Sequence, residues 1–196
     1  MRSILCHVAL SAAITLGLPA ITNAQDAMRR LDATIVEGVS LRRTVRMSFN
    51  DAPAELLPQL LTRVDLYDPN IVEVRFDHSQ SETPGQFGVG SRRICVFGDG
   101  RELVEPIVVY DPPHSLGYTV DAEASTMSLP VSDIILIYDF QAAESGGTDL
   151  TVKAYFDPRI AGTGPVIEPV LTGTLRRTFQ TAVDVFGGTY RGDEKP

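Results

Sequence analysis

The fold of this chain is decided by the stretch GVGSRRICVFGDGRELVEPIVVYDPPHSLGYTV, residues 88–120, together with its continuation to Pro158. Glycines accept a positive φ, so Gly98-Asp99-Gly100 predicts a tight hairpin turn between two strands. Two prolines remove backbone donors and fix φ, so Asp111-Pro112-Pro113 predicts the end of the next strand. Ser145-Gly146-Gly147 predicts the last turn. The stretch is therefore typical of five consecutive antiparallel strands.

The last two predicted strands each carry one apolar face. In the first, alternate residues from 134 to 140 are apolar, and in the second, alternate residues from 150 to 156 are apolar. Because successive strand side chains point to opposite faces, each apolar set should face the core. We predict that Tyr118, Tyr138 and Phe156 point inward and that Lys153 points outward.

Helix and strand signals precede this stretch. Residues 41–49 alternate well enough for a first strand, and residues 71–76 form another. Between them, the leucines of residues 56–61 give an apolar stripe typical of a helix. Pro58 lies inside this stripe, so we expect it to bend the helix or split it into two short ones.

A different periodicity begins at Pro165. Apolar residues recur every three or four positions from Ile167 to Phe186, which predicts a long amphipathic helix. Gly187-Gly188 is a typical signal for its C-terminal end. The chain therefore runs from one strand through a helix pair and six strands to a long final helix, which is an α+β order.

Several motifs in the strands resemble those of one known superfamily. They are GVGSRRICVF at 88–97, GDG at 98–100, LVE at 103–105, YDPP at 110–113, LGY at 116–118 and YFDP at 155–158. On these motifs the chain resembles the polyketide cyclase/dehydrase branch of the SRPBCC superfamily, also called START-like or birch-pollen-allergen-like. The resemblance implies an α+β helix-grip fold, in which a curved antiparallel sheet of about seven strands wraps around a long C-terminal helix, with a short helix pair after the first strand.

A lipocalin barrel is the alternative fold, because it also combines antiparallel strands with a C-terminal helix and export. This chain contains no Trp, which that family carries in its N-terminal signature. The helix pair between the first two strands also fits a lipocalin poorly. The helix-grip fold is therefore the one we predict.

The first residues have the pattern of a cleaved export signal. Arg2 precedes an apolar run from Ile4 to Leu18, and Thr22-Asn23-Ala24 supplies small residues before a polar start at Gln25. We therefore expect a signal peptide at residues 1–24 and an exported protein that is periplasmic or secreted. The rest of the chain is predicted to divide into a lead-in without assigned role at residues 25–40, one helix-grip domain at 41–188 and a polar tail at 189–196.

Composition argues against several classes of partner. The chain has 17 basic and 25 acidic residues, a formal net charge of -8 at pH 7. Nucleic acids and anionic lipid headgroups are bound by clustered Lys and Arg, so we predict neither as a partner. No later stretch approaches the roughly 20 apolar residues of a membrane span, so no integral span is expected in the mature chain.

Cysteine usage predicts a fold without disulfides. Cys6 lies in the predicted signal peptide, so Cys95 is the single thiol expected in the mature chain. Cys95 lies on a predicted strand without a neighbouring His to activate it. We predict that it is a small buried hydrophobic residue.

A cavity is the expected functional feature of this architecture, because one helix cannot fill the concave side of a curved sheet. Tyr118 and Tyr138 would place polar atoms in an otherwise apolar chamber, although core aromatics with satisfied hydroxyls are an equally good interpretation. The residues predicted to bind a ligand are Arg92, Tyr118, Leu136, Tyr138, Phe140, Val152, Phe156, Leu171 and Leu175.

Glu105 is a candidate for either a buried ion pair or a catalytic acid or base, because it lies in a strand that is apolar on both faces. An ionised carboxylate there is costly without a partner. Arg92 or Arg93, across the hairpin turn, can supply one, and we favour this cross-strand ion pair. If Glu105 instead faces the cavity unpaired, it becomes a candidate acid or base for enolisation and dehydration of a carbonyl ligand.

Signatures of other enzyme classes are missing from the sequence. His78 and His114 are the only histidines after residue 24, and no Cys or His cluster has metal-ligand spacing. Gly88-Val89-Gly90 lacks the third glycine and the following helix of a dinucleotide site. We therefore predict neither a metal nor a cofactor.

Three functions remain open from the sequence. The first is an exported protein that binds a hydrophobic small molecule, a lipid or polyketide-like compound, between the sheet and the last helix. The second is a cyclase, aromatase or dehydratase that moves protons on a bound carbonyl compound through Glu105, Tyr118 or an arginine. The third is a protein-interaction domain whose cavity has collapsed.

Overall fold

The computed structural model describes residues 34–196, so the predicted signal peptide and residues 25–33 of the lead-in lie outside the described part of the chain. The described residues form an α+β fold. The elements in chain order are β1 (Leu41–Phe49), α2 (Pro53–Thr62), α3 (Val64–Tyr67), β2 (Ile71–Asp77), β3 (Arg92–Phe97), β4 (Glu102–Asp111), β5 (Ser115–Thr119), β6 (Val131–Ala142), β7 (Thr148–Pro158), α4 (Gly164–Phe186) and β8 (Gly188–Glu194).

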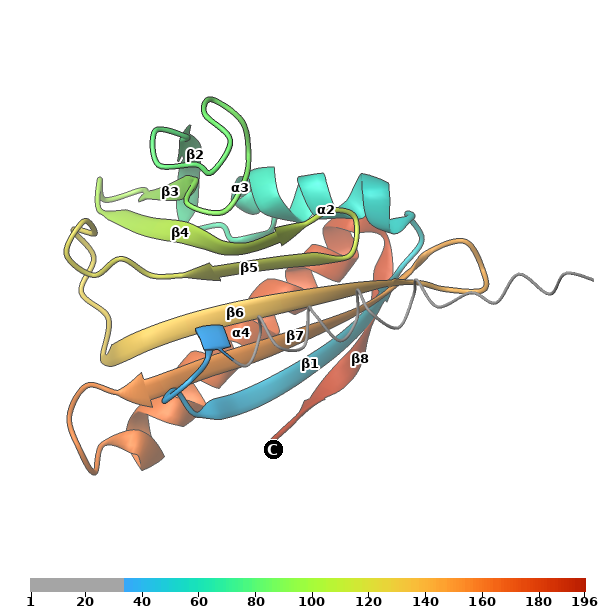
Figure 1. The fold of residues 1–196 in the computed structure, drawn as a ribbon. Helices are drawn as coiled ribbons and strands as arrows, with labels where there is room; N and C mark the ends of the chain where they lie inside the picture. The colour runs from blue at the N-terminus through green and yellow to red at the C-terminus, as the bar shows by residue number, and fades with distance from the viewer. Residues whose placement is uncertain (1–33) are drawn as a thin grey trace, which may run out of the picture.

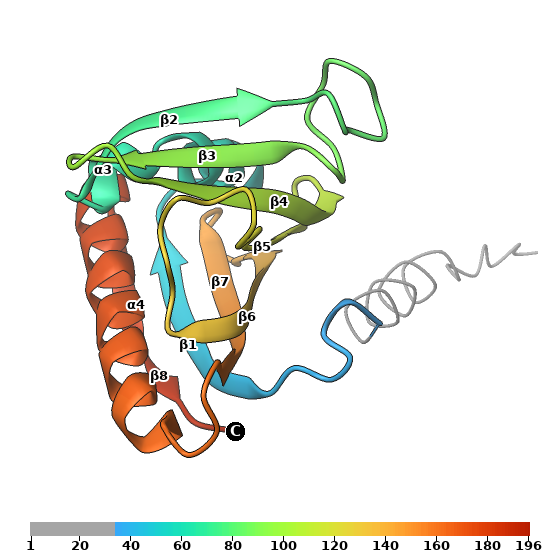
Figure 2. The same cartoon turned by 90° about the vertical axis from the view of Figure 1, so that its left-hand side faces the viewer.

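All of these strands join one antiparallel sheet with the order β2-β3-β4-β5-β6-β7-β1-β8. The sheet is curved, and α4 lies along its concave side (Figure 1). The main sheet contacts of α4 are to β8, β1 and β7. In the view of Figure 2, β2, β3 and β4 arch over the C-terminal end of α4. The helix therefore covers one half of the sheet far better than the other.

The long helix follows its predicted pattern and ends where the sequence indicates. Phe179 and Val183 are buried on its apolar face, and Leu175 packs against the same core. Gly187 caps the helix with φ 72°, a left-handed conformation that glycine adopts without a Cβ penalty. Its N–H donates to the carbonyl of Val183. The predicted helix and its glycine cap are confirmed.

The helix pair is present, but Pro58 does not separate its two members as predicted. α2 continues through Pro58 to Thr62, and the break comes at Arg63, whose φ of -114° and ψ of 42° are not helical. Pro58 lies in the interior of α2 and removes one backbone donor there, but the four buried leucines on both sides of it hold the helix on the core. Burial therefore outweighs the local cost of the proline.

Residues 188–194 form the edge strand β8, where the sequence predicted a polar tail at 189–196. Gly188 pairs with Phe49 at one end of β1, and Glu194 pairs with Thr44 near the other. The charges that resembled a solvated tail instead anchor the strand, because Arg176 holds Asp193 through two nitrogens at 2.7 and 2.9 Å. Edge strands accept charged residues, since their outer side faces water. The sheet thus has eight strands instead of about seven.

The end of the lead-in, to which the sequence assigned no role, covers the convex side of the sheet. Ile35, Val36 and Val39 pack against a small buried cluster of Val109, Ile135 and Ile137. This cluster explains why β4 and β6 are apolar on both faces. Residues 34–40 therefore belong to the folded domain.

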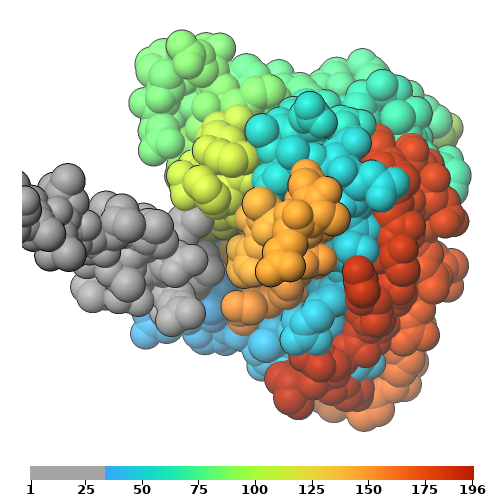
Figure 3. Space-filling view, turned by 90° about the vertical axis from the view of Figure 1, so that its right-hand side faces the viewer, coloured from blue at the N-terminus to red at the C-terminus, as the bar shows by residue number. Residues whose placement is uncertain are grey.

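One end of the fold is closed by the turn between β6 and β7. In Figure 3 this turn, in orange, lies against the residues around α2, in cyan. The hydroxyl of Thr148 donates to the carbonyl of Asp51 at 2.7 Å, which joins the start of β7 to the loop before α2. Because this end is filled, space on the concave side is left farther along the sheet.

Gly188→Ala tests whether residues 188–194 form a strand on β1. A Cβ at position 188 would collide with the carbonyl oxygen of Ser48 and lie 3.0 Å from the Phe49 ring. Overpacking of this kind costs about 1–3 kcal/mol, so we expect a matching loss in the free energy of unfolding measured by urea titration. Gly98→Ala is the control, because its Cβ would meet only Val72 at 3.7 Å. Equal stability of the two variants would contradict the strand.

Candidate functional site

A cavity of about 270 Å³ lies between α4 and the concave side of the sheet. The side chains predicted to point inward, Tyr118, Tyr138 and Phe156, all line it, and Lys153 is exposed on the opposite face as predicted. Among the residues predicted to bind a ligand, the structure places these six along the cavity: Tyr118, Leu136, Tyr138, Phe156, Leu171 and Leu175.

Three of the predicted residues do not line the cavity. Phe140 and Val152 are fully buried in the core beyond it, where Phe140 pairs with Leu150 across the β6–β7 ladder. Arg92 points away from the cavity and pairs with Asp121 at 3.3 Å, leaving 35% of its side chain exposed. Neighbouring residues of a strand face opposite sides of the sheet. Arg93, and not Arg92 as predicted, is therefore the arginine that points into the cavity.

The polar end of the cavity is built on a buried ion pair. Arg93 Nε donates to Glu105 Oε2 at 2.7 Å, and their side chains are 3% and 7% exposed. The two residues lie directly opposite each other in the β3–β4 ladder, which confirms the favoured cross-strand pair. Arg93 Nη1 also donates to the carbonyl of Leu61 at 3.3 Å. Burial alone would lower the pKa of Arg93, but the adjacent charge of Glu105 reverses the direction and raises it.

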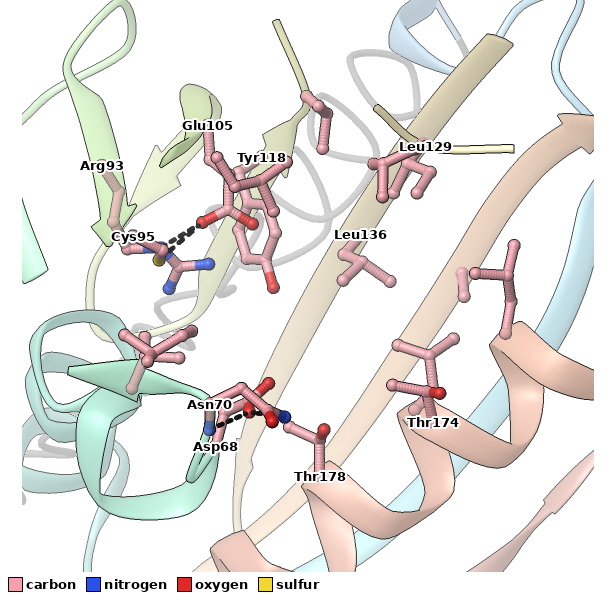
Figure 4. A pocket seen from close by; sticks show the side chains of 18 of the residues that line it. Asp68, Asn70, Arg93, Cys95, Glu105, Tyr118, Leu129, Leu136, Thr174 and Thr178 are labelled. Carbon is pink, nitrogen blue, oxygen red and sulfur yellow. Dashed lines mark hydrogen bonds and ion pairs between the residues drawn. The ribbon is translucent and has the colours of Figure 1, made fainter. Parts of the chain in front are cut away.

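Cys95 completes this polar end. It is 1% exposed, which confirms its predicted burial, and its thiol donates to Glu105 Oε2 at 3.3 Å. Burial, reinforced by the charge of Glu105, raises the pKa of the thiol. Cys95 therefore remains a neutral hydrogen-bond donor instead of a nucleophilic thiolate. Figure 4 shows Arg93, Cys95 and Glu105 gathered beside Tyr118.

Buried tyrosines continue the polar end toward the middle of the cavity. The hydroxyls of Tyr118 and Tyr138 are 2.9 Å apart, and the Arg93 guanidinium lies 4.2 Å from the centroid of the Tyr118 ring. Tyr67 donates its hydroxyl to the carbonyl of Leu60 at 2.6 Å. Burial raises the pKa of all three tyrosines, so they stay protonated at neutral pH. Asn70 and Thr174, labelled in Figure 4, also line the cavity and are exposed to solvent, so we place the mouth of the cavity on their side.

Sequence reasoning missed part of this wall. Arg93 and Cys95 point to the same face of β3, and the hairpin at Gly98-Asp99-Gly100 brings both against Glu105. Counting residues outward from that turn would have identified them as part of the site. Met127 and Leu129 line the apolar end from the connection between β5 and β6. They are alternating apolar residues in an otherwise polar segment, which is the pattern that would have identified them.

Neither a metal-binding cluster nor a membrane-spanning helix is found among the described residues. Within residues 34–196, no group of three or more His, Cys, Asp or Glu side chains is arranged to hold a metal ion. No helix in the same range is both long and apolar enough to span a bilayer.

No protein-family model matches this chain, and no curated protein sequence matches it at a significant level. Solved structures do match it. A START superfamily protein from Mycobacterium smegmatis is 9% identical, with a TM-score of 0.56 over 74% of this chain and 97% of that one. A point mutant of norcoclaurine synthase from Thalictrum flavum, in complex with a transition state analogue, is 14% identical, with a TM-score of 0.53 over 76% and 96%. Major latex-like protein 151 from Panax ginseng is 14% identical, with a TM-score of 0.54 over 75% and 99%.

These identities are low, so the likeness concerns the fold. It covers about three quarters of this chain and nearly the whole length of each matched structure. The helix-grip architecture implied by the sequence motifs is confirmed.

Arg93→Met tests the energetic role of the buried pair. Removing Arg93 leaves Glu105 as an uncompensated buried charge, so we expect a loss of about 3–5 kcal/mol in the free energy of unfolding. Arg92→Met, which breaks only the half-exposed pair with Asp121, should cost less than about 1 kcal/mol. The double variant Arg93→Met with Glu105→Leu should recover most of the loss. A double variant as unstable as Arg93→Met would contradict this interpretation.

Proposed function

We propose that this chain, which has the helix-grip fold of the START-like superfamily, binds an apolar small molecule between its sheet and α4. The observation that carries the proposal is the cavity of about 270 Å³, which has mainly apolar walls, a buried polar cluster at the Arg93–Glu105 end and polar residues at the mouth. Ligand sites typically have this composition, with apolar area for affinity and few polar groups for orientation. A lipid or a polyketide-like compound is the class of ligand we propose.

The cavity supports binding over the protein-interaction alternative. In that alternative the interior would be collapsed, and the walls would pack on one another. Here Leu136 of β6 and Leu171 of α4 line the same cavity instead. The mouth between Asn70 and Thr174 gives a molecule a route inside. A molecule that fills this space would remove its own apolar surface and that of the walls from water.

The ion pair bears on the enzyme alternative implied by the polyketide cyclase/dehydrase resemblance. A general base needs a lone pair directed at the substrate. Glu105 Oε2 already accepts hydrogen bonds from Arg93 and Cys95, both of which are buried with it. Tyr118 and Tyr138 bond to each other and remain protonated at neutral pH. These groups are arranged to hold a ligand in place, so we favour binding without turnover.

Export is the second part of the proposal. Arg2, the apolar run that follows it and the small residues before Gln25 support cleavage after residue 24. We propose that the mature protein acts in the periplasm or outside the cell.

Filling the cavity should abolish ligand binding. The neutral dye N-phenyl-1-naphthylamine brightens in apolar sites, and we expect it to bind the unmodified protein with saturable fluorescence. Leu175→Trp, which adds bulk from α4 into the cavity, should weaken that binding by about tenfold or more, equivalent to about 1.4 kcal/mol. Val170→Trp is the matched control, because Val170 is 65% exposed on the same helix. If dye affinity were the same for both variants, the dye site would lie elsewhere.

Native mass spectrometry of protein purified from its own compartment gives an independent test, in which a co-purifying apolar molecule is the expected result.

Export is tested by the mass of the protein recovered from the producing cells. We expect the mature chain to begin at Gln25 and to be found outside the cytoplasm. An intact mass that still includes residues 1–24 in a correctly folded, fractionated sample would contradict the signal peptide. This outcome would leave the binding proposal unaffected.

A further inference from the structure

We propose that the cavity selects uncharged ligands that carry a carbonyl or hydroxyl oxygen, that it excludes carboxylates, and that Glu105 sets this selection. This inference rests on the proposed function, since it specifies the class of molecule that the same cavity binds.

The charges along the cavity leave no cation for an anionic ligand. Among the described residues that line it, Arg93 is the single basic side chain, and its partner Glu105 lies 2.7 Å away. Asp68 adds a carboxylate near the mouth, where it accepts from Asn70 at 2.9 Å. Figure 4 shows the ion pair at one end of the cavity and Asp68 at the other. The lining therefore sums to a net negative charge.

A carboxylate ligand would be penalised in this setting. It would lose its hydration on entering the cavity, and the cation that should compensate is already paired. Repulsion by Glu105 would be stronger here than in water, because the surroundings are of low polarity. The net charge of -8 on the whole chain also disfavours the approach of anions. Fatty acids and other free carboxylates are thus the wrong class of ligand.

A neutral oxygen, in contrast, finds donors in the same place. In a pair of hydroxyls one proton bonds the other oxygen, and the second proton is left for another acceptor. The Tyr118–Tyr138 pair therefore has one proton to offer. The guanidinium of Arg93 carries five N–H donors, of which Nε bonds Glu105, Nη1 bonds Leu61 and one further N–H bonds Tyr118. A carbonyl or hydroxyl oxygen would accept from these groups while the body of the ligand contacts Leu129, Leu136 and Leu171.

The test uses 2-naphthamide and 2-naphthoate, which have nearly the same shape but differ in charge at neutral pH. Each compound competes with bound N-phenyl-1-naphthylamine on the unmodified protein. We expect the amide to displace half of the dye at a concentration that is lower than the carboxylate needs by about tenfold or more. Equal displacement by both compounds would overturn the inference and leave the proposed function standing. Absence of dye binding would instead overturn the proposed function itself.

The role of Glu105 is tested by Glu105→Gln, which leaves the charge of Arg93 without its partner. We expect this variant to lose the preference for the amide and to bind naphthoate more tightly than the unmodified protein does. Glu102→Gln is the matched control on the same strand, because Glu102 pairs with Arg75 and does not line the cavity. The control should keep the amide preference.

Glu105→Gln is expected to lose stability, because Arg93 is left buried and unpaired. A second measurement, of melting temperature, therefore tests the role of Glu105 independently of dye binding. Naphthoate should raise the melting temperature of Glu105→Gln more than naphthamide does, because it supplies the missing counter-charge. The unmodified protein should show the reverse order. If the amide stabilised both proteins more than the carboxylate does, Glu105 would not be the residue that sets the selection.

Discussion

The structure depends on one geometric constraint, which is that a single helix must serve the whole concave side of an eight-stranded sheet. α4 meets this demand only in part, because its main contacts are with β8, β1 and β7. The short helices α2 and α3 cover the closed end, where four leucines of α2 are buried. Between these covers several inner side chains of β3 to β6, among them Glu105 and Leu136, face the cavity. The cavity is thus a consequence of the layer arrangement.

The same constraint explains why charges lie where they do. Arg93 and Glu105 occupy the part of the sheet that the helix does not reach, so their heads can meet each other without displacing core side chains. A buried ion pair is retained only when further contacts support it, and here Leu61, Cys95 and the Tyr118 ring contact the pair. The pair, the thiol and the tyrosine ring therefore form one unit. Because the pair itself is neutral, Asp68 leaves the cavity lining with a net negative charge.

Most of the fold could be predicted from the sequence because its signals are local. The turn at Gly98-Asp99-Gly100, the apolar alternation of β6 and β7 and the glycine cap of α4 each depend on neighbouring residues alone. The errors come from tertiary contacts that outweigh local preference. Pro58 did not end α2 because leucines on both sides are buried, and residues 188–194 became a strand because β1 had a free edge. In the site, parity identified the inward tyrosines, but the choice between Arg92 and Arg93 required the register of the Gly98-Asp99-Gly100 hairpin, which pairs Arg93 with Glu105.

The cost of the cavity is itself an argument about function. At about 24 cal/mol per Å³, a dry void of this size would forgo roughly 6 kcal/mol of packing energy. That is comparable with the whole stability of many domains, which is about 5–15 kcal/mol. Water entering through the mouth reduces the cost only at the polar end, since Leu129, Leu136 and Leu171 offer it no hydrogen bonds. Larger side chains at these positions would fill the space, yet the chain contains no Trp at all. A wall of medium-sized residues around an unfilled centre is the arrangement expected when a bound molecule supplies the missing contacts and stabilises the folded state in proportion to its affinity.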